Sequence, residues 1–147
     1  MIRIAGLNDL EGVAELFDLY RQFYEQESNI DLARDFIKSR IERNESTILV
    51  FLHNDDPVGF CQLYPSFCSV SAIPVFILYD LYVKSEYRKH GVAKQLMLTA
   101  EVHARQSGKL RLELSTAKNN YAAQKLYESL GWVKDDVFFY YSRETRN

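Results

Sequence analysis

The stretch of sequence that decides the fold is Leu81-Tyr82-Val83-Lys84-Ser85-Glu86-Tyr87-Arg88-Lys89-His90-Gly91-Val92-Ala93. It completes an apolar run, residues 75–83, whose poor alternation is typical of a strand that is covered on both faces. After Gly91 the apolar residues recur with a helical period, at Ala93, Leu96, Met97, Ala100 and Ala104. The stretch therefore predicts a buried strand that turns into a helix near Gly91.

This predicted turn is a candidate anion site. The first N–H groups of a helix lack partners and lie at the positive end of its dipole, so they can hold a pyrophosphate. Gly91 would let phosphates approach the backbone, and the small Ala93 would keep the first turn clear. Arg88 and Lys89 would add positive charge. Taken alone, one Gly and one Arg are better explained by an ordinary strand-to-helix turn.

The rest of the chain is expected to alternate between strands and helices. Hydrophobic periodicity predicts strands over 1–5, 47–52, 58–64, 75–83, 110–114, 132–133 and 137–142. Helices are expected after Asn8, over 31–43, from Gly91 to Gly108 and over 120–130. The order β-α-α-β-β-β-α-β-α-β-β predicts an α/β protein with helices on both faces of a mixed sheet. No repeat or linker interrupts it, so one domain over 1–147 is expected.

Composition restricts the classes of partner. A net charge of -2 provides no bulk attraction to nucleic acid or to anionic membranes, so neither is expected as a partner. No apolar run is long enough to span a bilayer, and the first residues lack the segments of a signal peptide. Cys61 and Cys68 form no CxxC pair and are interpreted as reduced thiols of a cytoplasmic protein. The scattered His53, His90 and His103 indicate no metal site.

A second motif changes the interpretation of the turn. It is Asn120-x-x-Ala123-x-x-Leu126-Tyr127-x-x-x-Gly131-Trp132, a short helix that ends at a glycine. Together with Arg88-x-x-Gly91-x-Ala93, it resembles the two signatures of the GNAT superfamily of N-acetyltransferases, Q/R-x-x-G-x-G/A and N-x-x-A-x-x-L-Y-x-x-x-G-F/W. The order of the predicted elements resembles that family over the whole chain.

The resemblance implies a fold and a binding site for acetyl-CoA. The fold would be α/β, with a mixed, mostly antiparallel sheet in which the strand ending at Val83 splays away from the strand at 110–114. Pantetheine would lie in that opening against the backbone of Leu81 and Val83, and the pyrophosphate would sit on the N–H groups of 89–94. The residues implied in binding acetyl-CoA are Leu81, Tyr82, Val83, Arg88, Lys89, His90, Gly91, Val92, Ala93, Lys94, Asn120 and Tyr127.

The resemblance also implies the chemistry of acetyl transfer to an amine. Asn120 would contact the pantetheine arm, and Tyr127 would protonate the departing thiolate as a general acid. An alkyl amine with a pKa of about 10.4 is only about 0.1% neutral near pH 7.5, so a proton must be removed before nitrogen attacks the thioester. Direct attack in a ternary complex needs no covalent enzyme intermediate.

Asp80 is the candidate acid at the acceptor end. It is the lone acid in the apolar run 75–83, and it either contacts a cationic amine or is a carboxylate that a neighbouring strand satisfies or that faces solvent. The segment 79–83 resembles the matching strand of the spermidine/spermine and histone/polyamine acetyltransferase branches. Tyr79 stands where the spermidine/spermine enzymes carry a second acid. The acceptor therefore stays open among polyamines, diamines and amino-acid-like amines.

Two other functions compete with acetylation of a small-molecule amine. One is acetylation of a protein lysine or N-terminus on the same fold. The other is a regulatory module that binds acyl-CoA without transferring the acyl group, against which the presence of Tyr127 argues. The resemblance also implies a homodimer, formed through the C-terminal strands rich in Phe and Tyr.

Overall fold

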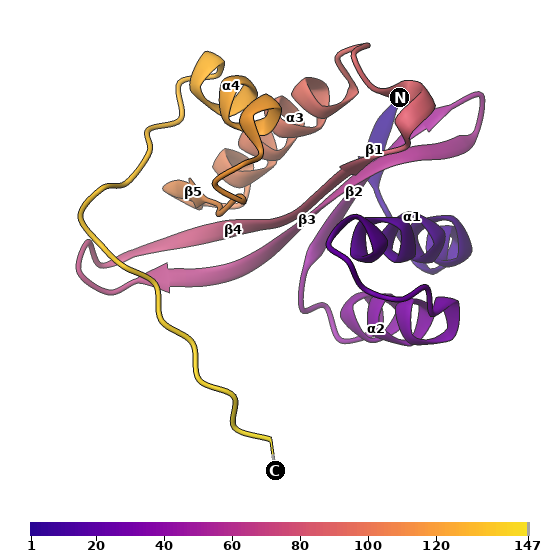
Figure 1. The fold of residues 1–147 in the computed structure, drawn as a ribbon, viewed down its shortest axis with the longest axis horizontal. Helices are drawn as coiled ribbons and strands as arrows, with labels where there is room; N and C mark the ends of the chain where they lie inside the picture. The colour runs from indigo at the N-terminus through magenta and orange to yellow at the C-terminus, as the bar shows by residue number, and fades with distance from the viewer. Residues whose placement is uncertain (147) are drawn as a thin grey trace. The chain divides into compact units, whose positions relative to one another are not determined.

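The computed structural model describes residues 1–146 and divides into two compact units, Met1–Ser115 and Thr116–Asn147. Figure 1 traces both units along the chain by colour. The single domain expected over 1–147 stays a prediction.

The first unit is a five-stranded sheet with helices on both faces. Its elements are β1 (Ile2–Ile4), η1 (Leu7–Asp9), α1 (Leu10–Phe23), α2 (Ile30–Glu42), β2 (Thr47–His53), β3 (Asp56–Cys68), β4 (Ile73–Val83), η2 (Ser85–Tyr87), α3 (Val92–Gln106) and β5 (Arg111–Glu113). The strand order is β1-β2-β3-β4-β5. The pairs β1–β2, β2–β3 and β3–β4 are antiparallel and β4–β5 is parallel, which confirms the mixed, mostly antiparallel sheet.

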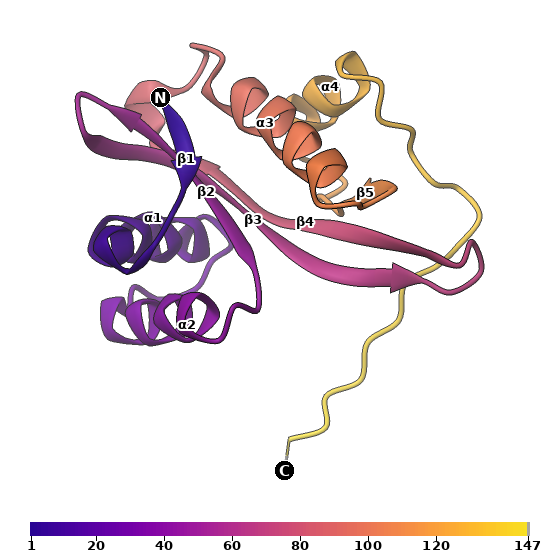
Figure 2. The same cartoon turned by 180° about the vertical axis from the view of Figure 1, so that it is seen from behind.

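Helices α1 and α2 cover one face of this sheet and α3 covers the other, as Figures 1 and 2 show from opposite sides. The buried stripe of α1 and α2 packs on β2 and β3 in one core, which holds Val13, Leu16, Phe17, Ala33, Ile37, Ile48, Val50 and Phe60. On the other face, Leu96 approaches Gly59 of β3 so closely that a Cβ there would meet Leu96 Cδ1 at 3.4 Å. The missing side chain at Gly59 therefore lets α3 lie directly on the sheet.

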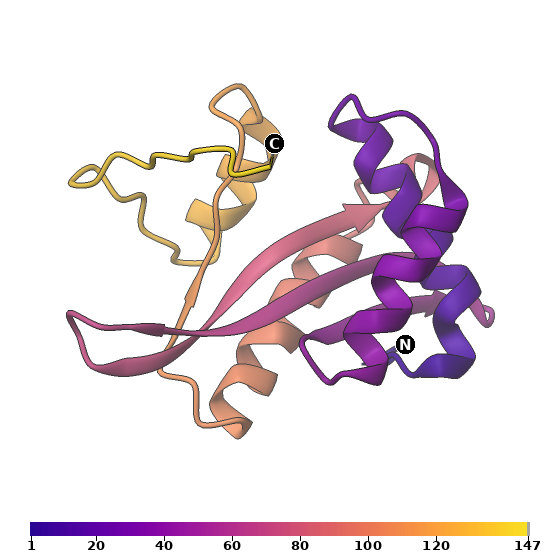
Figure 3. The same cartoon turned by 90° about the horizontal axis from the view of Figure 1, so that it is seen from below.

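A bulge interrupts the long β3–β4 hairpin, which can be followed in Figure 3. Gln62 pairs with Asp80 and the next residue, Leu63, pairs with Leu78, so Tyr79 is the extra residue. In an unbroken strand Phe76 and Asp80 would point to the same face. Phe76 stacks on His103 of α3, whereas Asp80 faces the side of α1 and α2. The bulge thus directs Asp80 toward these two helices.

Strand β4 extends well beyond its pairing with β5. The parallel ladder runs only from Val75↔Arg111 to Ile77↔Glu113. Among the residues that the structure describes in the first unit, none forms a strand beside 78–83 on this edge. The pairing therefore agrees with the expected splayed pair, and it leaves backbone groups of β4 open at this edge.

The second unit contains α4 (Tyr121–Ser129), but the two strands expected after it are absent from the described residues. The prediction of strands at 132–133 and 137–142 is wrong. A strand needs a neighbour for its backbone groups, and the alternating aromatic pattern of 137–142 finds none in this unit. The side chains of Phe138, Phe139, Tyr140 and Tyr141 are 80–92% exposed.

Candidate active site

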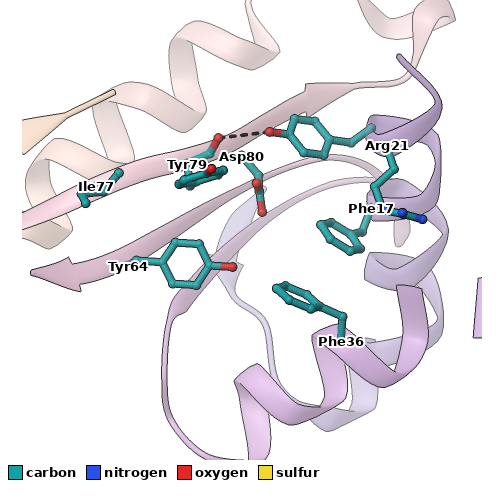
Figure 4. Close-up of a pocket in the computed structure, with 8 residues that line it drawn as sticks. Phe17, Arg21, Phe36, Tyr64, Ile77, Tyr79 and Asp80 are labelled. Carbon is teal, nitrogen blue, oxygen red and sulfur yellow. Dashed lines mark hydrogen bonds between the residues drawn. The ribbon is translucent and has the colours of Figure 1, made fainter. Parts of the chain in front are cut away.

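An open pocket of about 490 Å³ lies on the side of β4 that faces α1 and α2 (Figure 4). Its lining residues are Phe17, Tyr20, Arg21, Phe36, Tyr64, Ile77, Tyr79 and Asp80. Phe17 and Phe36 stack with their ring centroids 5.2 Å apart, and Tyr64 meets Tyr79 edge to face at 5.8 Å. Mostly apolar walls with a few polar groups are typical of a site for a small molecule.

The Asp80 carboxyl is the buried acid of this pocket, and it is only 3% exposed. The side chain of Gln62, directly across the ladder, donates a hydrogen bond from Nε2 to Asp80 Oδ2. Ser46 Oγ in turn donates to Gln62 Oε1 at 2.7 Å. The neighbouring strand therefore satisfies one oxygen of Asp80, as one of the two sequence interpretations required, while the carboxyl still lines the pocket.

Burial raises the pKa of Asp80 to about 6, although the hydrogen bonds from Gln62 and Tyr20 favour its ionised form. Burial, reinforced by the charge of Asp80, raises the pKa of Tyr20 and of Tyr64 well above the ordinary range. These phenols are therefore neutral at physiological pH. A carboxylate that ionises near pH 6 among aromatic rings can attract an ammonium group and can accept its proton.

The turn after β4 places a row of backbone N–H groups at the start of α3. Lys89 and Gly91 both adopt the left-handed backbone conformation, with φ of 64° and 81°. The first helical hydrogen bond runs from Gln95 N to the carbonyl of Gly91, so the N–H groups of 92–94 have no acceptor inside the helix. This geometry fits a pyrophosphate, because such N–H groups bind anions.

Arg88, which was expected to add positive charge at the anion site, points instead to the end of β4. Its Nε donates to the carbonyl oxygen of Val83 at 2.8 Å, and its guanidinium lies 5.3 Å from the ring centroid of Tyr82 and 5.8 Å from that of Phe23. In this conformation the Arg88 side chain stabilises the turn by a hydrogen bond to the end of β4. Lys89 and His90 are exposed at the turn. The role of these residues in binding acetyl-CoA stays a prediction.

Asn120 and Tyr127 belong to the second unit. Asn120 is the N-cap of α4, and its side-chain oxygen accepts a hydrogen bond from Ala123 N at 3.3 Å. The ring centroids of Tyr127 and Trp132 lie 6.2 Å apart, and the backbone N–H of Trp132 donates to the carbonyl oxygen of Tyr127. The motif residues thus build the ends of this helix, and their expected roles at the thioester stay predictions.

The structure brings Asp80, Leu81, Tyr82 and Val83 onto one strand that leads directly into the turn of 88–94. Sequence reasoning missed Gln62 and Arg21. Gln62 could have been found as the one strongly polar side chain within the apolar run 58–64. Arg21 follows Phe17 by one helical turn on the apolar face of α1, which is an unusual place for a cation.

Two further sequence expectations concern metal and membrane. Among residues 1–146, no three His, Cys, Asp or Glu side chains gather as metal ligands would. None of the described helices is long and apolar enough to cross a bilayer.

Comparisons with known proteins identify the family. The Acetyltransferase (GNAT) family model matches residues 13–132. An uncharacterized N-acetyltransferase of Bacillus subtilis (strain 168), YhfO, is 41% identical over 140 residues, which cover 95% of this chain and 94% of YhfO. A probable acetyltransferase of Haemophilus influenzae (strain ATCC 51907 / DSM 11121 / KW20 / Rd) is 30% identical over 117 residues, covering 78% of this chain and 79% of that protein.

A solved structure shows the same fold. The crystal structure of a probable acetyltransferase superposes with a TM-score of 0.92 at 40% identity, covering 100% of this chain and 99% of that one. The likeness extends from the sheet and its helices to the sequence that forms the turn and the second motif, since both motifs lie within the matched residues. The chain therefore belongs to the acetyltransferase (GNAT) family and is an acyltransferase.

Proposed function

We propose that the protein transfers the acetyl group of acetyl-CoA to a primary amine of a small molecule bound in the pocket between β4, α1 and α2. The observation that carries this proposal is the buried Asp80 carboxyl in an aromatic pocket of about 490 Å³. Its size suits a small molecule, and its charge suits an ammonium group. The GNAT family, to which the chain belongs, uses acetyl-CoA.

The open edge of β4 and the start of α3 are the proposed site of acetyl-CoA. Backbone groups of Leu81 to Val83 would bond the pantetheine arm as an added strand would. The N–H groups of 92–94, together with the left-handed turn before them, would hold the pyrophosphate. Acetyl-CoA supplies the activated acyl carbon, and the chain supplies its orientation toward the pocket.

Asp80 is proposed to accept the proton of the amine. A full transfer from a free alkylammonium, pKa about 10.4, to a carboxyl of pKa about 6 is unfavourable by about 6 kcal/mol. An ammonium nitrogen has no lone pair, so one proton must leave to solvent before the attack, and burial in the pocket favours this by lowering the pKa of the amine. The neutral nitrogen then becomes far more acidic as it bonds to the acyl carbon. Asp80 is proposed to accept this second proton as the amide bond forms. Tyr127 is the proposed acid that protonates the thiolate as it leaves.

The test is acetyl-CoA-dependent thiol release with monoamines, diamines, polyamines, amino acids and lysine peptides, beside a control without acceptor. Turnover with small amines, lowered at least a hundredfold by Asp80→Asn, would support the proposal. The matched control is Asp56→Asn, at the start of β3, where the carboxylate is exposed and lies 3.8 Å from Lys84 Nζ. Turnover with peptides alone would instead indicate a protein acetyltransferase. Binding of acetyl-CoA without any transfer would indicate a regulatory module.

Assembly and location belong to the same proposal. A homodimer would bury the exposed aromatic side chains of 138–141, and sedimentation as a strict monomer would contradict it. A cytoplasmic location follows from the reduced thiols proposed for Cys61 and Cys68.

A further inference from the structure

Gln62 lies directly beside the Asp80 carboxyl inside the sheet. It occupies the position of β3 that pairs with Asp80 of β4, and its side chain is 0% exposed. Asp80 lines the pocket, but Gln62 does not belong to its lining residues. An acceptor in the pocket therefore meets Asp80 and cannot reach Gln62, so Gln62 can influence the acceptor only through Asp80.

Both polar atoms of the Gln62 amide are engaged. Nε2 donates a hydrogen bond to Asp80 Oδ2, and Oε1 accepts one from Ser46 Oγ at 2.7 Å. An ionised carboxylate offers only lone pairs, so it requires the donor side of the amide. Because Ser46 donates to the opposite side, the amide is held with Nε2 toward Asp80. Ser46, Gln62 and Asp80 thus form a chain of hydrogen bonds that fits an ionised carboxylate and ends at the pocket.

Burial makes this bond important for Asp80. Removal from water raises the pKa of the carboxyl, and hydrogen bonds from Gln62 and Tyr20 oppose the rise, with Gln62 having the larger effect. The Tyr20 hydroxyl also donates to the backbone oxygen of Tyr79 at 3.2 Å, so its single proton is not reserved for Asp80. Gln62 is therefore the principal donor that stabilises the charge of Asp80.

The other ionisable groups around Asp80 are phenols, a thiol and two arginines. They are Tyr20, Tyr24 and Arg21 of α1, Arg40 of α2, Cys61 and Tyr64 of β3 and Tyr79 of β4. Burial raises the pKa of Tyr20, Tyr24, Cys61 and Tyr64, so these four stay neutral near pH 6. The arginines stay charged. Arg21 points away from Asp80 beyond Phe17 (Figure 4), and Arg40 lies 4.4 Å from the ring centroid of Phe36.

Building on the proposed function, we infer that Gln62 is a positioning residue: oriented by Ser46, it keeps Asp80 ionised and presents this carboxylate to the acceptor amine. The bond from Nε2 stabilises the charge that attracts the ammonium group. It also keeps the carboxylate able to accept a proton at neutral pH, when the amide bond forms. Gln62 does this without touching the acceptor.

The first experiment replaces Gln62 by methionine, which has a similar length and no donor. The bend of log(kcat/KM) near pH 6 should move upward by about one to two pH units, from the usual strength of a hydrogen bond to a charged group. Most of the lost activity should return near pH 9, where Asp80 is ionised in both proteins. An NMR titration of the Asp80 carboxyl carbon in the free protein, assigned by its loss in Asp80→Asn, should show the same shift.

Ser46→Ala is the milder second variant, because Ser46 is only partly buried. It should shift the bend in the same direction by less than Gln62→Met, and it should add no shift when it is combined with Gln62→Met. The matched control is Cys61→Ala, which shortens the neighbouring buried side chain of β3 on the opposite face of the sheet. This control should leave both the bend and the NMR titration of Asp80 unchanged.

The outcomes separate the inference from the proposed function. An equal loss of activity at every pH in Gln62→Met, with the bend and the NMR titration unmoved, would overturn the inference and leave the proposed function standing. A further shift from Ser46→Ala in the Gln62→Met background would overturn the part assigned to Ser46. Absence of turnover with every amine in the wild type would overturn the proposed function, and the NMR titration would still decide whether Gln62 keeps Asp80 ionised.

Discussion

The substitution Asp80→Asn is expected to lower activity at least a hundredfold and yet to stabilise the protein above pH 6. Burial raises the pKa of this carboxyl from its ordinary value of 3.8 to about 6. The folded protein therefore retains a proton that the unfolded chain has already released between these two pH values. Because the folded state binds more protons there, the free energy of unfolding falls as the pH rises through this window.

The size of the effect follows from the same two values. Raising the pKa from 3.8 to about 6 costs about 3 kcal/mol of stability once Asp80 is fully ionised, at 1.36 kcal/mol for each pKa unit. Asparagine has nearly the same shape and can still accept the hydrogen bond from Gln62, but it carries no charge. The variant should therefore match the wild type near pH 4 and exceed it by about 3 kcal/mol near pH 8, or roughly 6–12 °C in Tm.

The assay is urea unfolding of both proteins at a series of pH values from about 4 to 8. Asp56→Asn serves as the control, because it makes the same chemical change at an exposed carboxylate outside the pocket. If the Asp80→Asn and wild-type curves ran parallel over the whole range, the raised pKa of Asp80 would be refuted. The role of Asp80 as proton acceptor would then lose its physical basis.

Three further predictions concern the same machinery. A plot of log(kcat/KM) against pH should bend near pH 6, with a slope that is steeper by one unit below the bend, because protonated Asp80 cannot accept the amine proton. Steady-state kinetics that show no such bend would exclude that role. Tyr127→Phe should lower turnover at least tenfold and leave acetyl-CoA affinity nearly unchanged, whereas turnover near that of the wild type would remove Tyr127 from the mechanism. Gly91→Ala should lower the free energy of unfolding in urea by about 1–2 kcal/mol and weaken acetyl-CoA binding, because alanine is strained in the left-handed backbone conformation at φ 81°. Steric contact adds nothing to this cost, since a Cβ would meet nothing closer than Gln95 Nε2 at 3.9 Å. Unchanged stability and affinity would contradict this account.

The sequence predicts well those features that depend on local pattern. The turn at Gly91 is one of them, because a strand that meets a helix there needs a left-handed residue, and the structure has φ of 81° at this position. The predicted strands at 132–133 and 137–142 are wrong because period-two alternation shows only that a strand is compatible with the side chains. A strand also needs a partner, and this part of the chain has none among the residues described in its own unit.

The orientation of Asp80 was beyond any reading of local pattern. Regular alternation would place it on the same face as Phe76, against α3. The bulge at Tyr79 reverses this, and it is visible only in the register between two strands, where Gln62 pairs with Asp80 and Leu63 with Leu78. Gln62 can be singled out in the sequence as a polar residue within an apolar run, but its role becomes apparent only when it is found opposite Asp80.

The distribution of unfavourable charges in the first unit points to the same pocket. Asp18 is as deeply buried as an active-site acid, yet three hydrogen bonds hold it and its pKa is lowered. Asp80 instead keeps a raised pKa, and Arg21 keeps a buried donor without a partner. Both destabilise the free protein, and both line one cavity. Such costs persist where a ligand removes them, and an ammonium group bound beside Asp80 would remove the cost of its buried charge.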